Sequence, residues 1–154
     1  MAGYYLDTSA LVKHYAQERG TVWVRTLTDP AQGHALYTVR LTGAEMVAAL
    51  SRKVRTGALS AADATHAIHT FRQDWHAWSR VLSVRPALID RAMDLAERHG
   101  VRGYDAVHLA AAMAAAAARR RSSLPDLTFI SADTNQRQAA AAEGLLVEDP
   151  NAHL

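Results

Sequence analysis

The sequence predicts an α/β protein: a three-layer α/β/α sandwich with a mainly parallel central sheet. Short β-prone runs alternate with longer segments of helical periodicity along the whole chain. Turn and cap signals fall between them. This alternation favours parallel strands covered by helices on both faces. The 154 residues suffice for one core and are too few for two ordinary domains, so we expect a single domain over 1–154.

The N-terminal elements are read from their apolar spacing. Residues 4–6 form a β-prone run and predict the first strand, and the helical pattern from Ala10 predicts a helix that ends near Gly20. Residues 21–27 fit the period of a helix as well as that of a strand, and we predict a helix there. Residues 35–39 predict the second strand.

Cap signals define the next two helices. Thr42 is expected to cap a helix that runs to Gly57, a residue that commonly ends helices. Ser60 with Asp63 three residues later resembles a capping box, which opens a long amphipathic helix to about Trp78.

The C-terminal half repeats the alternation. Residues 81–84 predict the third strand, and Pro86 suits the first turn of a helix that Gly100 ends. Residues 103–121 are helical throughout, and their alanine runs reflect helix propensity rather than disorder. The last elements are a strand, a helix closed by glycine and a final strand: 127–130, 134–143 and 145–148.

Composition excludes several classes of protein. The net charge is only +2, so the chain lacks the overall positive field with which histone-like proteins hold nucleic acid. It has no cysteine, which removes disulfides, thiolate zinc sites and a cysteine nucleophile, and which is the usual pattern of the cytoplasm. The N-terminal segment does not resemble a signal peptide. The longest stretch of low charge, 103–118, is too short to span a membrane and contains Asp105, so we expect no membrane segment.

Four carboxylates each stand alone in an apolar segment. An isolated carboxylate in a segment of that kind is costly to bury unless a cation or hydrogen bonds compensate it. The four residues are Asp7, Glu45, Asp105 and Asp133.

Their positions also predict that they meet. Asp7 and Asp133 directly follow predicted strands, whereas Glu45 and Asp105 lie in the first turns of predicted helices. In an open α/β sheet these places face the carboxyl ends of the strands, where such folds place their sites. A carboxylate cluster without cysteine suits Mg²⁺ or Mn²⁺. The chemistry that fits is metal-assisted hydrolysis of a phosphodiester.

Each acid alone has a simpler interpretation. Asp is a favourable N-cap, and an acid in the first helical turn complements the helix dipole by about 0.3–1 kcal/mol. Asp133 and Asp7 are the most cap-like, because Thr and Asn or Thr and Ser follow them. The metal-site hypothesis therefore depends on all four acids converging.

The chain resembles a known family at four motifs. They are Tyr5-Leu6-Asp7-Thr8-Ser9-Ala10-Leu11-Val12-Lys13, Ala44-Glu45, Gly103-Tyr104-Asp105-Ala106-Val107-His108-Leu109-Ala110-Ala111 and Ile130-Ser131-Ala132-Asp133. Their order and content resemble the PIN domain, specifically the VapC toxins of VapBC toxin–antitoxin modules.

The resemblance implies a Mg²⁺- or Mn²⁺-dependent endoribonuclease whose metal ligands and catalytic residues are the same four acids, with Asp133 at the most variable position. Its substrates would be tRNA or rRNA, cut to leave a 5′-phosphate and a 3′-hydroxyl, and its effect would be arrest of translation. The resemblance further implies a homodimer, inhibition by a VapB-type antitoxin, and contact with operator DNA through that antitoxin.

Other polar residues join the hypothesis. By the same resemblance Ser9, Ser131 and Asn135 would support the acids or the attacking water. Arg52, Lys53 and Arg55, and the run 119–121, are candidate RNA contacts, although such clusters are commonly solvated helix ends. His108 lies one turn after Asp105, and its spacing allows it to support the site.

Three alternative functions fit these residues less well. An RNase H-type nuclease would need a strand meander after the first acid, where this chain predicts a helix. A haloacid dehalogenase-type phosphatase would need Asp at position 9, where this chain has Ser9. A catalytically silent PIN-like module, which only binds antitoxin and co-represses its operon, would have no reason to bury four acids.

Overall fold

The fold is the predicted α/β/α sandwich. The computed structural model describes residues 1–78 and 80–154, and within these residues five strands form one sheet in the order β3-β2-β1-β4-β5, with every pairing parallel. The strands are β1 (Gly3–Leu6), β2 (Ala35–Val39), β3 (Val81–Leu82), β4 (Leu127–Ile130) and β5 (Leu146–Glu148).

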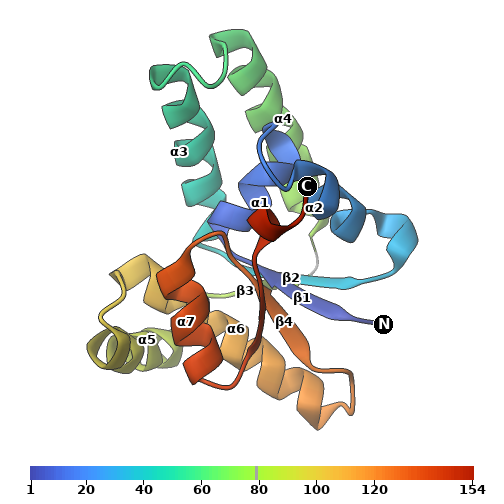
Figure 1. Cartoon of the computed structure of the whole chain (residues 1–154). Helices are drawn as coiled ribbons and strands as arrows, with labels where there is room; N and C mark the ends of the chain where they lie inside the picture. Colours follow the sequence, from blue (N-terminus) through green and yellow to red (C-terminus); the bar gives the residue numbers. More distant parts are fainter. Residues whose placement is uncertain (79) are drawn as a thin grey trace.

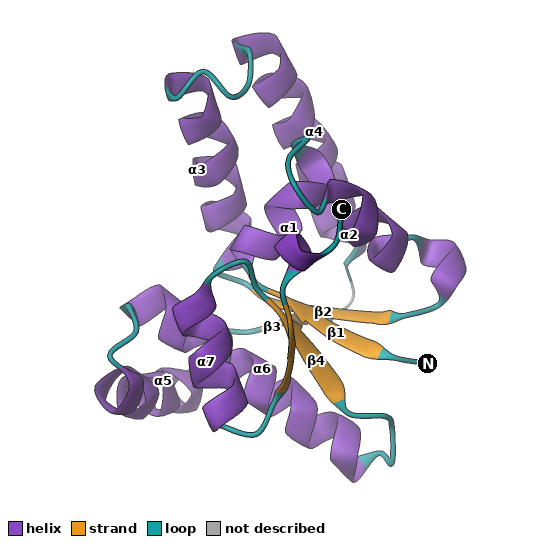
Figure 2. Ribbon diagram, in the orientation of Figure 1, coloured by secondary structure: helices purple, strands orange, loops and turns teal. Residues whose placement is uncertain are grey.

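Helices cover both faces of the sheet (Figures 1 and 2). Helices α1 to α4 pack on one face, where α3 and α4 form a projecting antiparallel pair, and α5 to α7 pack on the other. Their bounds are α1 (Thr8–Tyr15), α2 (Thr21–Thr28), α3 (Thr42–Arg55), α4 (Ala61–Ala77), α5 (Pro86–His99), α6 (Gly103–Arg121) and α7 (Thr134–Ala142), with 3₁₀ turns η1 (Pro30–Gln32) and η2 (Pro150–Ala152). None of the helices in the described residues combines the length and the apolar character of a membrane span.

The two cores follow from side-chain alternation along the central strands. Tyr5 and Phe129 face the layer of α5 to α7, whereas Leu6 and Ile130 face the layer of α1 to α4. The alanine run of α6 is buried in the first core, because small side chains let a helix approach the sheet closely. These packed layers fix the ends of β1 and β4.

The chain changes direction between β1 and β4. It builds outward from β1 through β2 to β3, then crosses back so that β4 pairs with the other edge of β1. Leu6 pairs with Ile130 at the carboxyl ends of these strands, and the Asp7 backbone N–H donates to the Ile130 carbonyl at 3.2 Å. A switch point of this kind opens a crevice in which α/β folds bind ligands.

The first helix is shorter than predicted. It ends at Tyr15, not near Gly20, because Ala16 adopts an extended conformation. Thr21 stabilises this early end: its hydroxyl accepts from the Glu18 backbone N–H at 2.9 Å and donates to the Ala16 carbonyl at 3.2 Å. The predicted helix over 21–27 is confirmed as α2.

Three smaller predictions were also wrong. Thr42 begins α3 and does not cap it, since its hydroxyl lies 2.7 Å from that of Thr38. Strand β3 ends at Leu82 because β2, its partner, ends at Val39. Strand β5 starts one residue late because the Leu145 N–H donates to a carbonyl at the end of α7.

Candidate active site

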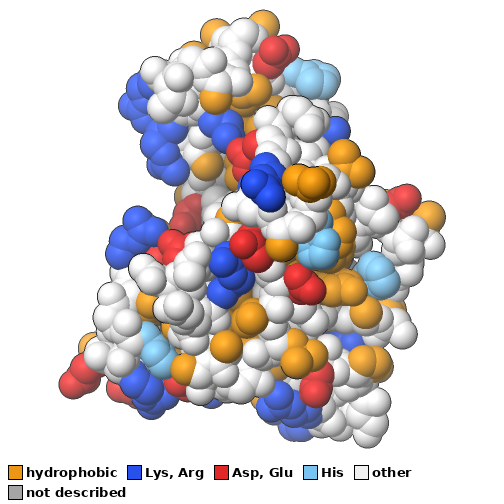
Figure 3. Space-filling model, viewed as in Figure 1, with side chains coloured by type: hydrophobic (Ala, Val, Ile, Leu, Met, Phe, Trp, Pro, Cys, Tyr) orange, Lys and Arg blue, Asp and Glu red, His pale blue; other side chains and the backbone are white. Residues whose placement is uncertain are grey.

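A single cavity of about 440 Å³ collects the predicted acids at the switch point. Strands β1 and β4 deliver two of them, and the first turns of α3 and α6 deliver the others. In Figure 3 the region between α3 and the start of α6 is a hollow that contains acidic side chains and has basic side chains on both sides. The acids are Asp7, Glu45, Asp105 and Asp133.

Asp7 is the most buried of the four, at 4% exposed. It caps α1: its Oδ1 accepts from the Ala10 backbone N–H at 3.1 Å and from the Ser9 hydroxyl at 2.6 Å. Burial raises the pKa of the Asp7 carboxyl above its ordinary value, although His108 and the neighbouring hydroxyls act in the opposite direction. Neutral donors therefore do not fully compensate the Asp7 charge.

Asp105 and Asp133 share one cation. Arg102 places its Nε 3.1 Å from Oδ2 of Asp105 and its Nη2 3.8 Å from Oδ2 of Asp133. Burial raises the pKa of Asp105, the contact with Arg102 lowers it, and the charge of Asp133 raises it again, so that the net shift is upward. The two carboxylates are thus close enough to repel each other, and both face the same guanidinium.

Glu45 is held by a chain of buried groups. Its Oε1 accepts from the Thr8 hydroxyl at 2.9 Å and lies 2.5 Å from Nε2 of His108. The other ring nitrogen, Nδ1, lies 2.9 Å from the Tyr5 hydroxyl. Burial raises the pKa of this hydroxyl well above its ordinary value. Because an ionised carboxylate only accepts hydrogen bonds, Nε2 of His108 donates to Glu45, and Tyr5 holds the other side of the ring.

Two serines connect the loops that carry Asp7 and Asp133. The Ser9 hydroxyl, which donates to Asp7, also accepts from the Ala132 backbone N–H at 2.9 Å. Ser131 is fully buried, accepts from the Asp133 N–H at 3.1 Å, and lies 3.4 Å from Ser9. Both serines predicted to support the acids therefore lie beside them.

Gln136, which the sequence analysis did not single out, joins α6 to α7. It is 1% exposed, donates from Nε2 to the Asp105 carbonyl at 2.7 Å, and donates its backbone N–H to Asp133 Oδ1 at 3.0 Å. A signal existed, since Gln three residues after the capping Asp133 matches a capping box. Asn135 is exposed and lines a neighbouring cavity instead, together with Asp105 and Asp133.

The candidate RNA contacts separate in the structure. Arg52 lines the acidic cavity from α3, two turns after Glu45 on the same helix. Lys53 pairs with Glu18 at 2.7 Å, so it serves the packing of α3. Arg55 does not line the acidic cavity as the described residues define it. Arg119 is buried and donates to the Pro125 carbonyl at 2.8 Å, which makes it structural.

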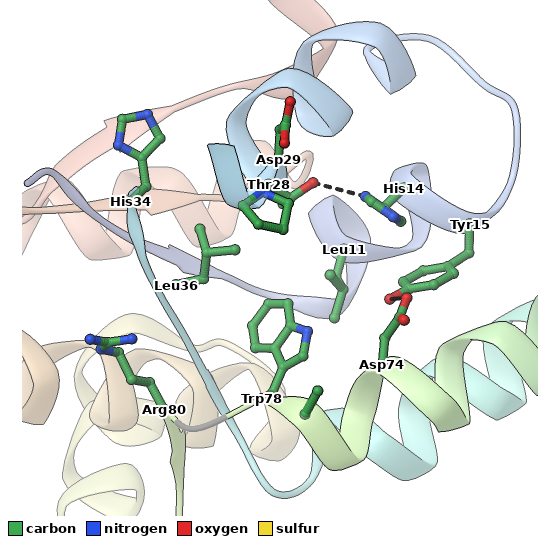
Figure 4. A pocket seen from close by; sticks show the side chains of 12 residues that line it. Leu11, His14, Tyr15, Thr28, Asp29, His34, Leu36, Asp74, Trp78 and Arg80 are labelled. Atoms are coloured by element: carbon green, nitrogen blue, oxygen red, sulfur yellow. Dashed lines mark hydrogen bonds between the residues drawn. The ribbon is translucent and has the colours of Figure 1, made fainter. Parts of the chain in front are cut away.

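A second cavity, of about 490 Å³, lies between α1, α2, β2 and the end of α4 (Figure 4). Its two carboxylates are occupied by protein groups: Asp74 accepts from the Tyr15 hydroxyl at 2.8 Å, and Asp29 caps η1. The His14 ring nitrogen lies 2.8 Å from the Thr28 hydroxyl. Unlike the first cavity, this one does not bring carboxylates together.

The acid set suits a hydrated ion. Across residues 1–78 and 80–154, no three Asp, Glu or His side chains lie close enough together to enclose a metal. Mg²⁺ does not need such a cage, because it keeps several waters and is commonly held by one or two carboxylates. The Oδ2 atoms of Asp105 and Asp133 already face one cation, Arg102, and therefore fit this kind of site.

Comparisons with known proteins agree with the fold. The profile of the PIN domain matches residues 4–142. Ribonuclease VapC45 of Mycobacterium tuberculosis (strain CDC 1551 / Oshkosh) is 34% identical over 110 residues, which are 71% of this chain and 74% of the relative. Ribonuclease VapC49 of Mycobacterium tuberculosis (strain ATCC 25618 / H37Rv) gives the same identity and coverage.

Two crystal structures share the fold. PAE2754 from Pyrobaculum aerophilum has a TM-score of 0.59 and 20% identity, with 98% of this chain and 85% of the other covered. FitAcB from Neisseria gonorrhoeae has a TM-score of 0.59 and 20% identity, with 98% and 99% covered. At this identity the likeness concerns the fold alone.

The profile match spans most of the chain, so this is a PIN-domain protein. The curated relatives narrow the class. The chain belongs to the VapC family of PIN-domain proteins.

Proposed function

We propose that this protein is a Mg²⁺- or Mn²⁺-dependent endoribonuclease and the toxin of a type II toxin–antitoxin pair. It would hydrolyse phosphodiester bonds of tRNA or rRNA and thereby arrest translation. Membership in the VapC family and the names of its ribonuclease relatives support this function. The observation that carries it is the convergence of four carboxylates in one cavity, where burial raises the pKa of two of them, Asp7 and Asp105.

The four acids would have different roles in ion binding, because their surroundings differ. Asp105 and Asp133, which face one cation position, would hold the ion, with Asp7 and Glu45 bound to it directly or through water. The ion, when bound, supplies positive charge that lowers the pKa of a coordinated water and polarises the phosphodiester. His108 would hold Glu45 in one orientation, and Ser9 would do the same for Asp7.

The reaction is an in-line displacement at phosphorus. The water oxygen loses a proton and bonds to phosphorus as the bond from phosphorus to the 3′ oxygen breaks. The leaving 3′ oxygen takes up a proton, so the products are a 5′-phosphate and a 3′-hydroxyl. RNA would enter as a single strand or loop, since a paired A-form helix keeps its bases from side chains. Arg52, which lines the cavity, would contact a phosphate of the RNA.

Charge balance favours a single divalent ion. Four carboxylates and two arginines, Arg52 and Arg102, line the cavity. One divalent cation would bring their formal charges to zero, whereas a second would leave an excess of positive charge before substrate binds. Stoichiometry of Mn²⁺ binding near one per chain would support this assignment.

The partners follow from the toxin function. We propose a homodimer that a VapB-type antitoxin inhibits and that contacts operator DNA through this antitoxin. An antitoxin arginine inserted among the acids would inhibit cleavage, because a guanidinium pairs bidentately with a carboxylate.

The alternative is a catalytically silent PIN-like module that binds only antitoxin and co-represses its operon. Burial that raises the pKa of Asp7 and Asp105 disfavours this alternative, because a scaffold would gain nothing from two such carboxylates. A silent module would show no stabilisation by Mn²⁺.

Cleavage of total cellular RNA with Mn²⁺ tests the function. We expect discrete 5′-phosphorylated fragments from the wild type, and a loss of roughly 100-fold or more with Asp7→Asn, with Asp105→Asn or with EDTA. Asp126→Asn is the matched control, since Asp126 forms an exposed ion pair with Arg120 outside the cavity and should leave cleavage unchanged. Equal inactivity of the folded, antitoxin-free wild type and both cavity variants, without any response to metal, would establish the silent module.

A further inference from the structure

Arg102 stands where an activating ion would also be attracted. It lies at the N-cap position of α6 and makes no side-chain cap bond, so the helix does not require its guanidinium. Its contacts with acids are the 3.1 Å contact to Asp105 and the 3.8 Å contact to Asp133. Both contacts are to carboxylates that would hold a divalent cation. An ion held by these two carboxylates would therefore compete with the guanidinium.

The side chain of Arg102 can move away from Asp105 and Asp133. It is 65% exposed, and no carboxylate holds it bidentately among the described residues. Its guanidinium carbon also lies 4.9 Å from the ring centroid of Tyr104, a partly exposed residue that lines the cavity. This aromatic face offers a cation–π contact that remains when the acids are occupied.

An RNA phosphate needs positive charge at this cavity. Without an ion the lining carries four carboxylates against two arginines, and this excess of negative charge repels a phosphodiester. The planar guanidinium matches phosphate bidentately, which an ammonium group does not. Once an ion holds Asp105 and Asp133, Arg102 has lost its carboxylates and lies at the rim of the cavity.

We propose that Arg102 changes partners: in the metal-free protein it neutralises Asp105 and Asp133, and when a divalent cation binds there it turns to a phosphate of the single-stranded RNA substrate. This inference deepens the proposed function and rests on it. It assigns Arg102 two roles, an internal competitor of the metal and a phosphate-binding residue. Metal and RNA binding are therefore positively coupled through one side chain.

Mn²⁺ affinity, read from the electron paramagnetic resonance signal of free Mn²⁺, tests the first role without requiring cleavage. We expect Arg102→Ala to bind Mn²⁺ about 5-fold more tightly or better, because a competing cation is gone. Arg102→Lys, which keeps the charge, should lie near the wild type. Arg98→Ala removes another exposed arginine, one that pairs with Glu143 away from the cavity, and should change nothing.

RNA binding tests the second role. The initial fluorescence anisotropy after rapid mixing with a labelled, random-sequence single-stranded RNA reports binding before cleavage. Mn²⁺ should raise the RNA affinity of the wild type, and Arg102→Ala should reduce this gain about 10-fold. Arg102→Lys should recover only part of it, because lysine cannot bind phosphate bidentately.

The outcomes separate this inference from the proposed function. Unchanged or weaker Mn²⁺ binding by Arg102→Ala would overturn the competition, and an unchanged Mn²⁺-dependent gain in RNA affinity would overturn the transfer to phosphate. A wild type that binds no Mn²⁺ would instead overturn the proposed function, and the inference with it.

Discussion

Two clusters of buried charge on the α1 side of the sheet are compensated in opposite ways. In the first, Glu18 accepts from Lys13 at 2.8 Å and from Lys53 at 2.7 Å, although Lys13 is itself 4% exposed. In the second, Asp7 is as buried as Lys13 but receives only neutral donors, the Ser9 hydroxyl and a backbone N–H. The first cluster joins α1 to α3, and the second opens into the acidic cavity.

The pKa shifts express this difference. Burial alone would raise the pKa of Glu18, but the hydrogen bonds from Lys13 and Lys53 outweigh burial and lower it. At Asp7 burial dominates, and the pKa is raised. A carboxylate paired with cations stabilises the folded chain, whereas a carboxylate without one is held at a cost that a bound cation would remove.

Breaking the compensated cluster should have the largest effect on stability. Glu18→Gln leaves the buried Lys13 ammonium without a charged partner, and we expect the free energy of unfolding to fall by about 2 kcal/mol. RNA cleavage at permissive temperature should be unchanged, since Glu18 lies outside the cavity. Urea denaturation measures the change, with Asp126→Asn as the control, for which less than about 0.5 kcal/mol is expected. A variant as stable as the wild type would show that the cluster is not compensated as described.

Acid should reduce the difference in stability between the wild type and Glu18→Gln. The folded pKa of Glu18 lies below its usual value of 4.5, so its pairing stabilises the protein above that pH and is lost as pH falls through the folded pKa. The gap in unfolding free energy between the wild type and Glu18→Gln should therefore narrow below about pH 4.5. Urea titrations between neutral pH and acid would follow this change. A gap that is constant with pH would mean that packing, and not charge, explains the destabilisation.

Much of this architecture could be predicted from the sequence, because it depends on local periodicity and helix caps. Helices α2, α5 and α6 and strands β2 and β4 lie where their patterns predict them. Where prediction failed, a tertiary contact decided. The early end of α1 depends on the Thr21 hydroxyl, and the length of β3 depends on where its neighbour ends.

The candidate site could be predicted from the sequence only in part. Asp7 and Asp133 follow strands, so their convergence could be inferred from parallel topology. The partners of the acids come from distant segments and could not be inferred: Tyr5 reaches His108 across 103 positions, and Lys53 turned out to pair with Glu18. Arg102, three residues before Asp105, gave no signal that separates it from an ordinary surface arginine.

Removing the uncompensated charge should stabilise the metal-free protein. In Asp7→Asn the amide oxygen still accepts from Ser9 and Ala10, while the costly charge is gone, and we expect a gain of about 1 kcal/mol at neutral pH, together with loss of cleavage. Because the folded pKa of Asp7 is raised, its cost is absent below the unfolded pKa and complete above the folded one. The gain should therefore shrink in acid.

Denaturation in EDTA measures this gain, and Mn²⁺ should then narrow or reverse the difference, because it stabilises the wild type more than the variant that has lost one of the four acids. A destabilised Asp7→Asn protein in EDTA would indicate that the charge is compensated within the chain after all.

The smallest effect should come from a neutral donor in the cavity. Thr8→Val keeps the shape at the start of α1 but removes the 2.9 Å hydrogen bond to Glu45, which His108 continues to hold. We expect cleavage to fall by about 3-fold and stability to change by less than about 1 kcal/mol, since a neutral hydrogen bond contributes about 0.5–1.5 kcal/mol. Thr65→Val, which removes a hydroxyl bonded only to its own helix, is the control. Steady-state cleavage rates at saturating Mn²⁺ compare the variants. A loss as large as that of Asp7→Asn would mean that Thr8, and not His108, fixes the orientation of Glu45.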